Sequence, residues 1–401
     1  MRVLFVSGWF PFPPDNGSRI RVYNLIKALS EENEVHLVAL LQEDSDPANA
    51  ARLAEICTVE SLHASRWFTG GRLGSLRGLF SNKPRSYIDT FDPAIIQSVR
   101  EAVDRVRPDV IVGFEISGMT YVPADIGCPV IFEELEIASM LRAVRGRRGL
   151  ARVRASLMLA KHRAFVKELL SRADAFTCVS PAELDLVKSS CAPGIEGHVI
   201  PNGVDTQRFA PRSRAPEPGR LLYNGALTFS ANLDAIRYFA SKIYPALARR
   251  LPDAKLRVTG RTSGVDLTGV ADCPGVELVG YVNDIRDELN ACVACLVPLR
   301  EGGGSRLKVL EAMAAGVPIV CTTLGAEGIE AEPGRHLLVA DTPDDLAEAV
   351  ERVTTDDALA RGLSTEARKL VEERYSWSII GRQVSELAKL LVRTSNANRL
   401  T

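Results

Sequence analysis

Short apolar segments of strand length alternate with longer segments of helical periodicity, and this alternation occurs twice along the chain. Strands that alternate with helices form parallel sheets covered by helices on both faces. The first series begins at residues 3–7, and a second begins at residues 220–223. The pattern therefore predicts an α/β fold of two doubly wound domains, which a length of 401 residues also favours.

Individual elements follow from the apolar segments and their flanking residues. Ser180-Pro181-Ala182-Glu183 has the form of a capping box and predicts the start of a helix. Helices are also expected after the first strand, at 93–106 and at 150–170. The expected strands are 3–7, 34–40, 109–114, 129–132, 175–179 and 198–200 in the first domain, and 220–223, 255–259, 277–279, 295–298, 318–321 and 337–339 in the second.

The domain boundaries are expected around residues 209–219, which are rich in proline and charge and suit an exposed linker. This places a first domain at 1–208 and a second at 220–375. Two open sheets joined by a short linker predict a central cleft, with ligands bound beyond the carboxyl ends of the strands. Loops that follow strands are therefore the candidate sites.

Bulk properties exclude several classes of protein. A formal net charge of −1 argues against a dedicated nucleic-acid binder. The eight scattered cysteines predict reduced thiols and a cytoplasmic protein. The opening apolar segment breaks at Gly8 without a cleavage site, and no later segment approaches the ~18 apolar residues of a membrane span. The chain is expected to be soluble or peripheral on a membrane.

The strongest candidate site is the glycine-rich segment after the strand 295–298. Gly302, Gly303 and Gly304 allow a ligand close to the backbone, and Ser305 leads into a helix expected at 306–315. Free N–H groups and the positive end of the helix dipole favour an anion such as diphosphate. The alternative is a glycine loop followed by a solvated basic turn. The two cations Arg306 and Lys308 favour a phosphate site instead.

Two cations and a carboxylate lie just beyond the glycines. Arg306 and Lys308 add positive charge at the start of the helix. Lys308 and Glu311 are three residues apart and share a helix face. Lys308 can then meet phosphate while Glu311 accepts hydrogen bonds from sugar hydroxyls.

Three other loops carry weaker candidates. Gly17, Ser18 and Arg19 stand at a helix start suited to an anion, and a structural turn fits them equally well. Arg261 follows the strand 255–259, where a plain surface arginine is at least as good an interpretation. Glu133 and Glu134 end the strand 129–132, where a carboxylate can orient or deprotonate an acceptor hydroxyl and a solvated acidic loop is the alternative.

The chain resembles the retaining family 4 glycosyltransferases of GT-B fold. The resemblance lies in residues 173–180, 200–209 and 310–320, with Ile200-Pro201-Asn202-Gly203-Val204-Asp205 and Leu310-Glu311-Ala312-Met313 among them. It implies two Rossmann-like domains that face a central cleft and a nucleoside-diphosphate sugar as donor. It also implies that the last helix, within 376–401, packs back on the first domain.

The resemblance also implies roles for individual residues. Glu311 would bind ribose hydroxyls, Gly303 and Gly304 would offer amides to the donor, Gly17 would line the diphosphate, and the backbone at Val282 would meet the base. The chain departs from the family pattern at three places. Gly303 replaces the first of two paired glutamates, and Glu301, two residues earlier, is the candidate to take over its catalytic role. Glu133 and Glu134 replace an acceptor-side histidine, and Gly225, expected in the donor site, has no phosphate lysine near it. Arg306 and Lys308 are inferred to take over its charge.

The expected activity is metal-independent transfer of a hexosyl group, without a cofactor, from a nucleoside-diphosphate sugar to a glycan, lipid-linked or small-molecule hydroxyl. The Gly-x-Arg-x-Lys stretch resembles envelope and exopolysaccharide transferases. A sugar-nucleotide-binding protein without transferase activity is the alternative, because the first paired glutamate is missing. No nucleic-acid partner is expected.

Two regions rich in basic and apolar residues are equally consistent with an anionic membrane surface as partner and with solvated helices. One spans residues 141–167, where no acidic residue occurs. The other spans 66–85. Both lie in the first domain, which is expected to bind the acceptor.

Overall fold

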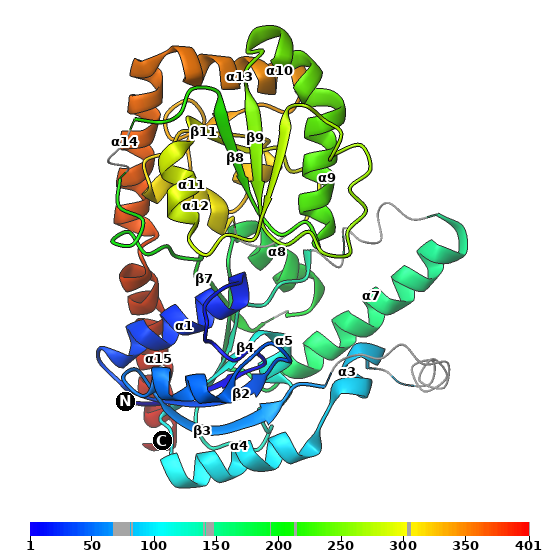
Figure 1. The fold of residues 1–401 in the computed structure, drawn as a ribbon. Coiled ribbons are helices and arrows are strands. Elements are labelled where there is room, and N and C mark those ends of the chain that lie inside the picture. The colour runs from blue at the N-terminus through cyan, green and yellow to red at the C-terminus, as the bar shows by residue number, and fades with distance from the viewer. Residues whose placement is uncertain are drawn as a thin grey trace. The chain divides into compact units, whose positions relative to one another are not determined.

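The computed structural model describes residues 1–66, 81, 83–138, 141, 148–192, 194–211, 215–302 and 306–400. The chain divides into two compact units. Unit 1 is Met1–Pro201 with Ile380–Thr401, and unit 2 is Asn202–Ile379. Each contains a parallel sheet with helices, as the alternation predicts (Figure 1).

The described part of unit 1 contains a seven-stranded parallel sheet in the order β3-β2-β1-β4-β5-β6-β7. The sheet grows from β1 first towards β2 and β3, and then on the other side from β4 to β7. The strand order therefore reverses between β1 and β4, which is where open α/β sheets bind ligands. The strands are β1 (Arg2–Ser7), β2 (Glu34–Leu41), β3 (Thr58–Ala64), β4 (Val110–Phe114), β5 (Val130–Glu133), β6 (Ala175–Cys178) and β7 (Glu196–Val199).

Helices cover the sheet of unit 1 because successive strand residues point to opposite faces. Leu4 and Phe132 belong to a core that also contains Val99 of α4 and Phe165 of α7. Helix α1 packs beside β2 and buries Leu25. The helical elements are α1 (Gly17–Ser30), η1 (Pro47–Leu53), α3 (Arg85–Thr90), α4 (Pro93–Val106), α5 (Glu115–Met119), α7 (Gly149–Leu170), α8 (Pro181–Ser190) and α15 (Trp377–Leu400), the last of which joins unit 1 from Ile380 on.

The capping sequence at Ser180 does start a helix. The Ser180 hydroxyl accepts a hydrogen bond from Glu183 N at 3.2 Å, and Pro181 opens α8. The Glu183 carboxylate accepts hydrogen bonds from the backbone of Ile137 and Ala138, the latter at 2.9 Å. This contact ties the segment after β5 to the start of α8.

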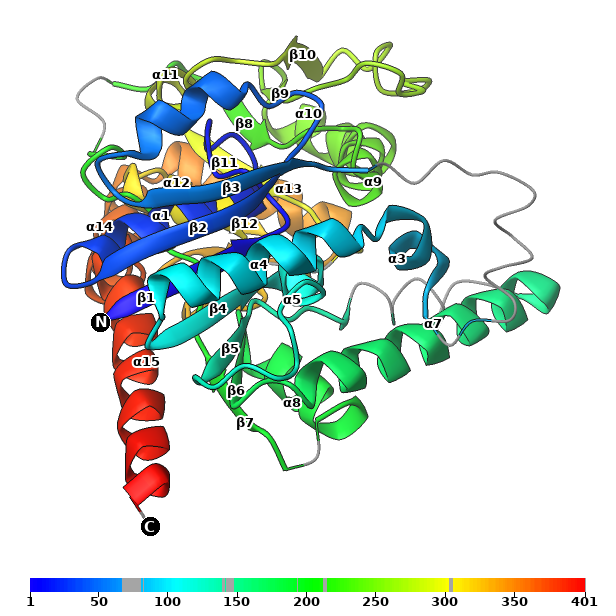
Figure 2. The same cartoon turned by 90° about the horizontal axis from the view of Figure 1, so that it is seen from below.

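The final helix packs on α1 within unit 1. Gly381 lies so close to α1 that an added Cβ would stand 2.1 Å from Ala28 Cβ. Farther along, Lys389 Nζ is 2.9 Å from Glu32 Oε2. Figure 2 shows this helix in red with its C-terminal end free of the sheet.

Unit 2 repeats the same plan with a six-stranded parallel sheet in its described residues, in the order β10-β9-β8-β11-β12-β13. Its strand order reverses between β8 and β11, so the loops after these two strands flank a second ligand-binding position. The strands are β8 (Arg220–Asn224), β9 (Lys255–Thr259), β10 (Val276–Gly280), β11 (Ala294–Val297), β12 (Ile319–Cys321) and β13 (Leu338–Val339).

The core of unit 2 lies between this sheet and its helices. Leu222, Leu256 and Leu296 of the sheet share it with Ile236 of α9 and Val350 of α13. The helical elements are α9 (Ser230–Tyr238), η2 (Phe239–Ile243), α10 (Tyr244–Arg250), α11 (Ile285–Ala291), α12 (Leu307–Ala314), η3 (Leu324–Ala326), α13 (Pro343–Thr355) and α14 (Asp357–Arg374).

Candidate functional site

In unit 2, Lys308 in the first turn of α12 reaches the loop that follows β8. Its Nζ donates a hydrogen bond to Asn232 Oδ1 at 2.9 Å and lies 4.0 Å from the centre of the Tyr223 ring. The Tyr223 hydroxyl donates to the same Asn232 oxygen at 2.7 Å. Burial, and then the nearby charge of Arg306, lowers the pKa of Lys308 to about 7.

Glu311 lies one turn farther along α12, at the carboxyl end of β8. Asn224, the last residue of that strand, donates from Nδ2 to Glu311 Oε2 at 3.3 Å, and Thr259 holds the Asn224 amide at 3.0 Å. Burial raises the pKa of Glu311 to about 7, against the opposing effect of Arg208, Asn224 and Lys308. Burial therefore moves the pKa of an ammonium group and that of a carboxyl group towards each other in this site.

Two glycines leave little room for a side chain near this cluster. A Cβ on Gly225 would stand 2.8 Å from Lys308 Nζ and 2.8 Å from Asn232 Nδ2. Gly260 has a φ of +115°, and a Cβ there would stand 2.6 Å from Ala226 N. The sequence predicts Gly225 as a donor-site residue. Because Gly225 has no side chain, it leaves the space into which Lys308 extends.

Arg306 immediately precedes α12 and is buried. Its Nε donates to the Leu324 carbonyl at 3.1 Å, and its Nη2 lies 3.4 Å from Glu327 Oε2 and 3.5 Å from the Gly302 carbonyl. These contacts join the glycine-rich segment to the loop after β12. Arg306 therefore positions the backbone before α12 in addition to placing its charge near Lys308.

The remaining predicted residues of unit 2 are less closely assembled. Glu301 and Arg261 are exposed, and Val282 is partly buried in the loop after β10. The Arg261 carbonyl accepts a hydrogen bond from Leu227 N at 2.9 Å, which joins the loops after β8 and β9. Gly303, Gly304 and Ser305 lie outside the described residues, and Gly302 has a φ of +101° that suits glycine.

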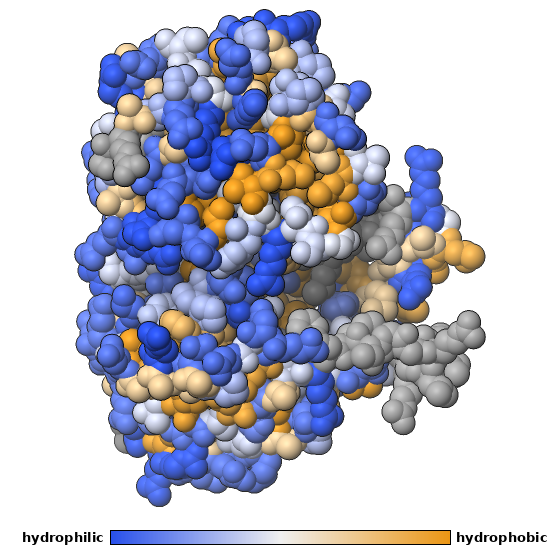
Figure 3. Space-filling model, viewed as in Figure 1, coloured by the Kyte–Doolittle hydropathy of each residue, from blue (hydrophilic) through white to orange (hydrophobic). Residues whose placement is uncertain are grey.

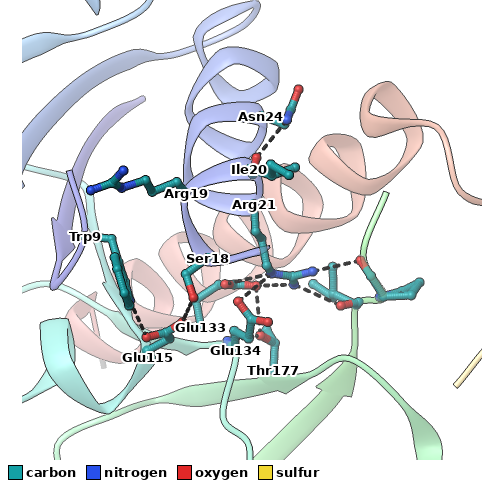
Figure 4. A network of polar contacts seen from close by, with 12 residues as sticks. Trp9, Ser18, Arg19, Ile20, Arg21, Asn24, Glu115, Glu133, Glu134 and Thr177 are labelled. Atoms are coloured by element: carbon teal, nitrogen blue, oxygen red, sulfur yellow. Dashed lines mark hydrogen bonds and ion pairs between the residues drawn. The ribbon is translucent and has the colours of Figure 1, made fainter. Parts of the chain in front are cut away.

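In unit 1, Glu133 forms a buried ion pair with Arg21 of α1 (Figure 4). Arg21 Nη2 lies 2.5 Å from Glu133 Oε1, and neither side chain is exposed. Arg21 also donates to the carbonyls of Ile200 and Pro201, each at 2.9 Å, and Thr177 donates to Glu133 at 3.1 Å. Glu133 thus has its hydrogen-bonding capacity taken up within the protein.

Glu134, the next residue, differs from Glu133 in its backbone conformation and in its hydrogen bonding. It has a φ of +56°, an uncommon conformation for a residue other than glycine. Its Oε2 lies 3.5 Å from Arg21 Nε but accepts no hydrogen bond from a described residue. Burial raises its pKa well above the usual value, and the charges of Glu115 and Glu133 add to this effect. The two adjacent glutamates therefore differ in their contacts: Glu133 is hydrogen-bonded to Arg21 and Thr177, whereas Glu134 Oε2 has only the longer ion pair with Arg21.

Glu115 follows β4 and repeats the geometry of Glu134, with a φ of +52°. Its carboxylate accepts hydrogen bonds from Ser18 Oγ at 2.5 Å and from Trp9 Nε1 at 2.9 Å (Figure 4). Burial raises the pKa of Glu115, and these two hydrogen bonds oppose the shift. Ser18, which the sequence indicates as a donor-site residue, is thus joined to the position where the strand order reverses.

Arg19 points away from this network. Its guanidinium lies 3.0 Å from Asp15 and 2.6 Å from Asp44, and it holds the loops after β1 and β2 together. Gly17, the first residue of α1, is exposed. Asn16 caps the helix by accepting a hydrogen bond from Arg19 N at 3.1 Å.

Sequence reasoning missed several residues of both clusters. Asn224 and Asn232 are neutral amides and lack the charge that indicates a phosphate site. Arg21 pairs with a residue 112 positions away, so no local pattern reveals it. Glu115 and Trp9 do carry a signal, because each follows a strand next to the reversal of strand order, where ligands bind.

Comparison with known families matches both units. A family described as Glycosyltransferase Family 4 matches residues 15–208, and one described as Glycosyl transferases group 1 matches residues 218–356. The MMP alpha-(1->4)-mannosyltransferase of Mycolicibacterium hassiacum is 27% identical over 238 residues, which are 55% of this chain and 54% of that protein. The chain spans about half the length of the curated relatives it matches.

Solved structures share the fold along nearly the whole chain. Sucrose-phosphate synthase from Thermosynechococcus elongatus has a TM-score of 0.72 at 17% identity, covering 98% of this chain and 99% of that one. Anabaena HepE, solved in complex with UDP and glucose, has a TM-score of 0.67 at 15% identity, covering 97% and 99%. From these structures and the two family matches, the predicted GT-B fold is confirmed, and the chain belongs to the family 4, group 1 glycosyltransferases.

Proposed function

We propose that the protein is a retaining glycosyltransferase that moves a hexosyl group from a nucleoside-diphosphate sugar to a hydroxyl acceptor. The observation that carries this proposal is the meeting of Lys308, Glu311 and Gly225 at the reversal of strand order in unit 2. A cation, a carboxylate and open backbone at that position match the phosphate and ribose of a nucleotide.

In the proposed reaction, the bond between the anomeric carbon and the β-phosphate oxygen breaks, and the acceptor oxygen takes the place of the phosphate. Lys308 stabilises negative charge as it develops on the departing β-phosphate, without a metal ion. Arg306 holds the backbone before α12 and adds a second charge. Glu311 accepts hydrogen bonds from ribose hydroxyls, and the amides of Gly302, Gly303 and Gly304 contribute further donors to the diphosphate.

The acceptor side of the proposal rests on Glu134. Its Oε2 accepts no hydrogen bond from a described residue. Glu134 itself directly follows β5, a central strand of unit 1. A raised pKa makes this carboxylate a stronger base than an ordinary glutamate, so it can orient an acceptor hydroxyl and take its proton. Glu133, held by Arg21, fixes the end of β5 from which Glu134 extends.

Two named relatives support the proposal of a hexose donor. HepE has been solved with UDP-glucose, and one curated relative is described as a GDP-mannose-dependent mannosyltransferase that acts on a phosphatidylinositol mannoside. By likeness, we propose a hexose donor and a glycan or lipid-linked acceptor on the cytoplasmic side of the cell envelope.

Loss of Lys308 tests the assignment of the donor site. Lys308→Met should reduce release of nucleoside diphosphate from UDP-glucose or GDP-mannose by about 100- to 1,000-fold, because it removes a charge that matters most in the transition state. Donor affinity, measured by calorimetry, should fall less. A thermal-shift screen of uridine, guanosine and adenosine diphosphate sugars first identifies the donor, since a bound ligand stabilises the fold.

Lys369→Met is the matched control, because Lys369 is exposed on α14 and lies outside the site. Arg306→Ala should also lower turnover, with a loss of thermal stability that Lys308→Met does not share. Undiminished turnover in both Lys308→Met and Arg306→Ala would show that neither residue acts in the transfer reaction. Donor binding without nucleotide release, with every acceptor offered, would instead identify a sugar-nucleotide-binding protein.

A further inference from the structure

Helix α7 of unit 1 exposes large apolar side chains along its first three turns. Leu150 is 88% exposed, Val153 65% and Leu157 50%. These positions are spaced i, i+3 and i+7, so the three side chains share one face of the helix. The last two turns of α7 are different, because Phe165, Val166, Leu169 and Leu170 are buried in the core of unit 1.

The same turns are strongly basic. Arg152 and Arg154 are exposed and form no ion pair with another described residue. Arg154 is four residues after Leu150 and lies on the same face as the apolar side chains. The helix contains five basic residues and one acidic residue, Glu168, which lies near its buried end.

The second basic region of the sequence behaves differently where it is described. Arg66 pairs with Asp92 at 2.7 Å, and Lys83 lies 3.4 Å from Glu168 and 5.3 Å from the centre of the Phe165 ring. Its other members, including Trp67, Phe68, Arg72 and Arg77, lie outside the described residues, as do Arg142, Arg145 and Arg147 of the first region. The exposed face of α7 is therefore the feature to explain.

Figures 1 and 2 show the start of α7 extending away from the sheet of unit 1. In Figure 3 the corresponding end of the helix carries hydrophobic surface next to hydrophilic surface. Among the described helices, none is long and apolar enough to cross a bilayer. An exposed helix with apolar side chains on one face, a basic residue beside them and another on the opposite face is suited to lie at the surface of a membrane.

We propose that the first three turns of α7 dock on a bilayer of anionic phospholipids, with Leu150, Val153 and Leu157 in the interface and Arg152 and Arg154 at the headgroups. Charge complementarity favours this occupant, because basic residues near an anionic leaflet are attracted to it. A second copy of the chain is disfavoured, since two such faces would bring like charges together with no acidic residue among them. Docking goes beyond the transfer reaction and does not depend on it.

Flotation with vesicles tests the proposal on the full-length protein, without donor or acceptor. The chain should float with vesicles containing 30% phosphatidylglycerol, should not float with pure phosphatidylcholine, and should dissociate as salt screens the attraction. Leu150→Ser with Leu157→Ser, and separately Arg152→Gln with Arg154→Gln, should each lower partitioning about tenfold or more. All four side chains are exposed, so circular dichroism and thermal melting should match the wild type.

Two substitutions elsewhere serve as matched controls. Leu390 on α15 is 50% exposed, as Leu157 is, and Arg361 on α14 is exposed and basic. Leu390→Ser and Arg361→Gln should leave flotation unchanged. Equal flotation of the α7 variants and the wild type, binding to neutral vesicles alone, or no binding to anionic vesicles would each overturn the proposal. So would a dimer in sedimentation velocity that Leu150→Ser abolishes, because it would assign the face to a second copy.

Discussion

The candidate sites of both units hold groups of opposite charge in buried or partly buried positions, but only the site of unit 1 joins Arg21 and Glu133 in a direct ion pair, whereas Lys308 and Glu311 of unit 2 each bond to a neutral side chain. In unit 1, Arg21 Nη2 lies 2.5 Å from Glu133 Oε1, and neither side chain is exposed. In unit 2, Lys308 and Glu311 lie one turn apart on α12 and are hydrogen-bonded to the neutral side chains of Asn232 and Asn224. The first arrangement satisfies its charges within the protein, whereas the second leaves them for a ligand.

The two arrangements also differ in how they affect the pKa values of their ionisable groups. Burial brings the pKa of Lys308 down, and that of Glu311 up, to about 7 each, because neither group has a strong ionic partner. Perturbed ionisable groups of this kind are typical of functional sites. A direct ion pair like that of Arg21 is more typical of a structural element, and here it fixes α1 to the end of β5.

Removing the charge of Glu133 should give the largest loss of stability. Glu133→Gln removes the closer of the two carboxylates beside the buried Arg21 guanidinium and leaves only Glu134, 3.5 Å from Arg21 Nε. This should lower the free energy of unfolding by about 3–5 kcal/mol. Urea denaturation followed by circular dichroism measures the loss. Arg21→Met combined with Glu133→Leu should recover much of it, because the double variant replaces this buried ion pair with apolar side chains.

An exposed ion pair provides the control for this prediction. Arg335 Nη2 lies 2.8 Å from Glu366 Oε2. The Arg335 side chain is about half exposed, and that of Glu366 is about one third exposed. Glu366→Gln should change stability by about 0–1 kcal/mol. If Glu133→Gln were as mild as Glu366→Gln, the pair in unit 1 would not be the structural element described here.

Donor binding should depend on pH through both groups of unit 2. Lys308 is charged below a pKa of about 7, so its contact with phosphate weakens as pH rises. Glu311 is charged above about 7, so its contact with ribose weakens as pH falls. Calorimetric affinity for the nucleoside diphosphate that the donor screen identifies should therefore be greatest near pH 7 and fall on both sides.

Each variant should remove one side of this profile. Glu311→Gln should weaken binding by about 10- to 100-fold at pH 8, where the wild-type carboxylate is ionised, and should abolish the decline on the acidic side. Lys308→Met should abolish the decline on the alkaline side. Profiles that keep both declines in both variants would show that other groups bind the donor.

Most of the fold could be predicted from the sequence because its central strands are buried on both faces and appear as apolar segments. Helix α4 begins and ends where predicted, since Asp92 caps it, Pro93 opens it and Arg107 leaves it with a φ of +49°. Strand β3 was missed. It is an edge strand whose residues are only partly buried, so Thr58–Ala64 mixes polar and apolar side chains.

The candidate site could be predicted only in part. Helical spacing was sufficient to place Lys308 and Glu311 on one face, because that relation is local. The sequence could not predict which of the adjacent residues Glu133 and Glu134 pairs closely with a cation. Their difference depends on Arg21, 112 residues from Glu133, and on the positive φ that turns Glu134 away from the strand.

The smallest expected effect separates these two glutamates. At pH 4 the Glu134 carboxyl is protonated in the folded chain and mostly protonated in the unfolded chain, so Glu134→Gln should leave stability unchanged to within about 0.5 kcal/mol. Its folded pKa is raised above the usual value, so ionisation of the unfolded chain disfavours the folded wild type as pH rises. The variant should then become slightly more stable than the wild type between pH 5 and pH 8 by thermal melting, opposite in sign to Glu133→Gln. A loss of stability at pH 8 would mean that Glu134, like Glu133, is a charge that the fold requires.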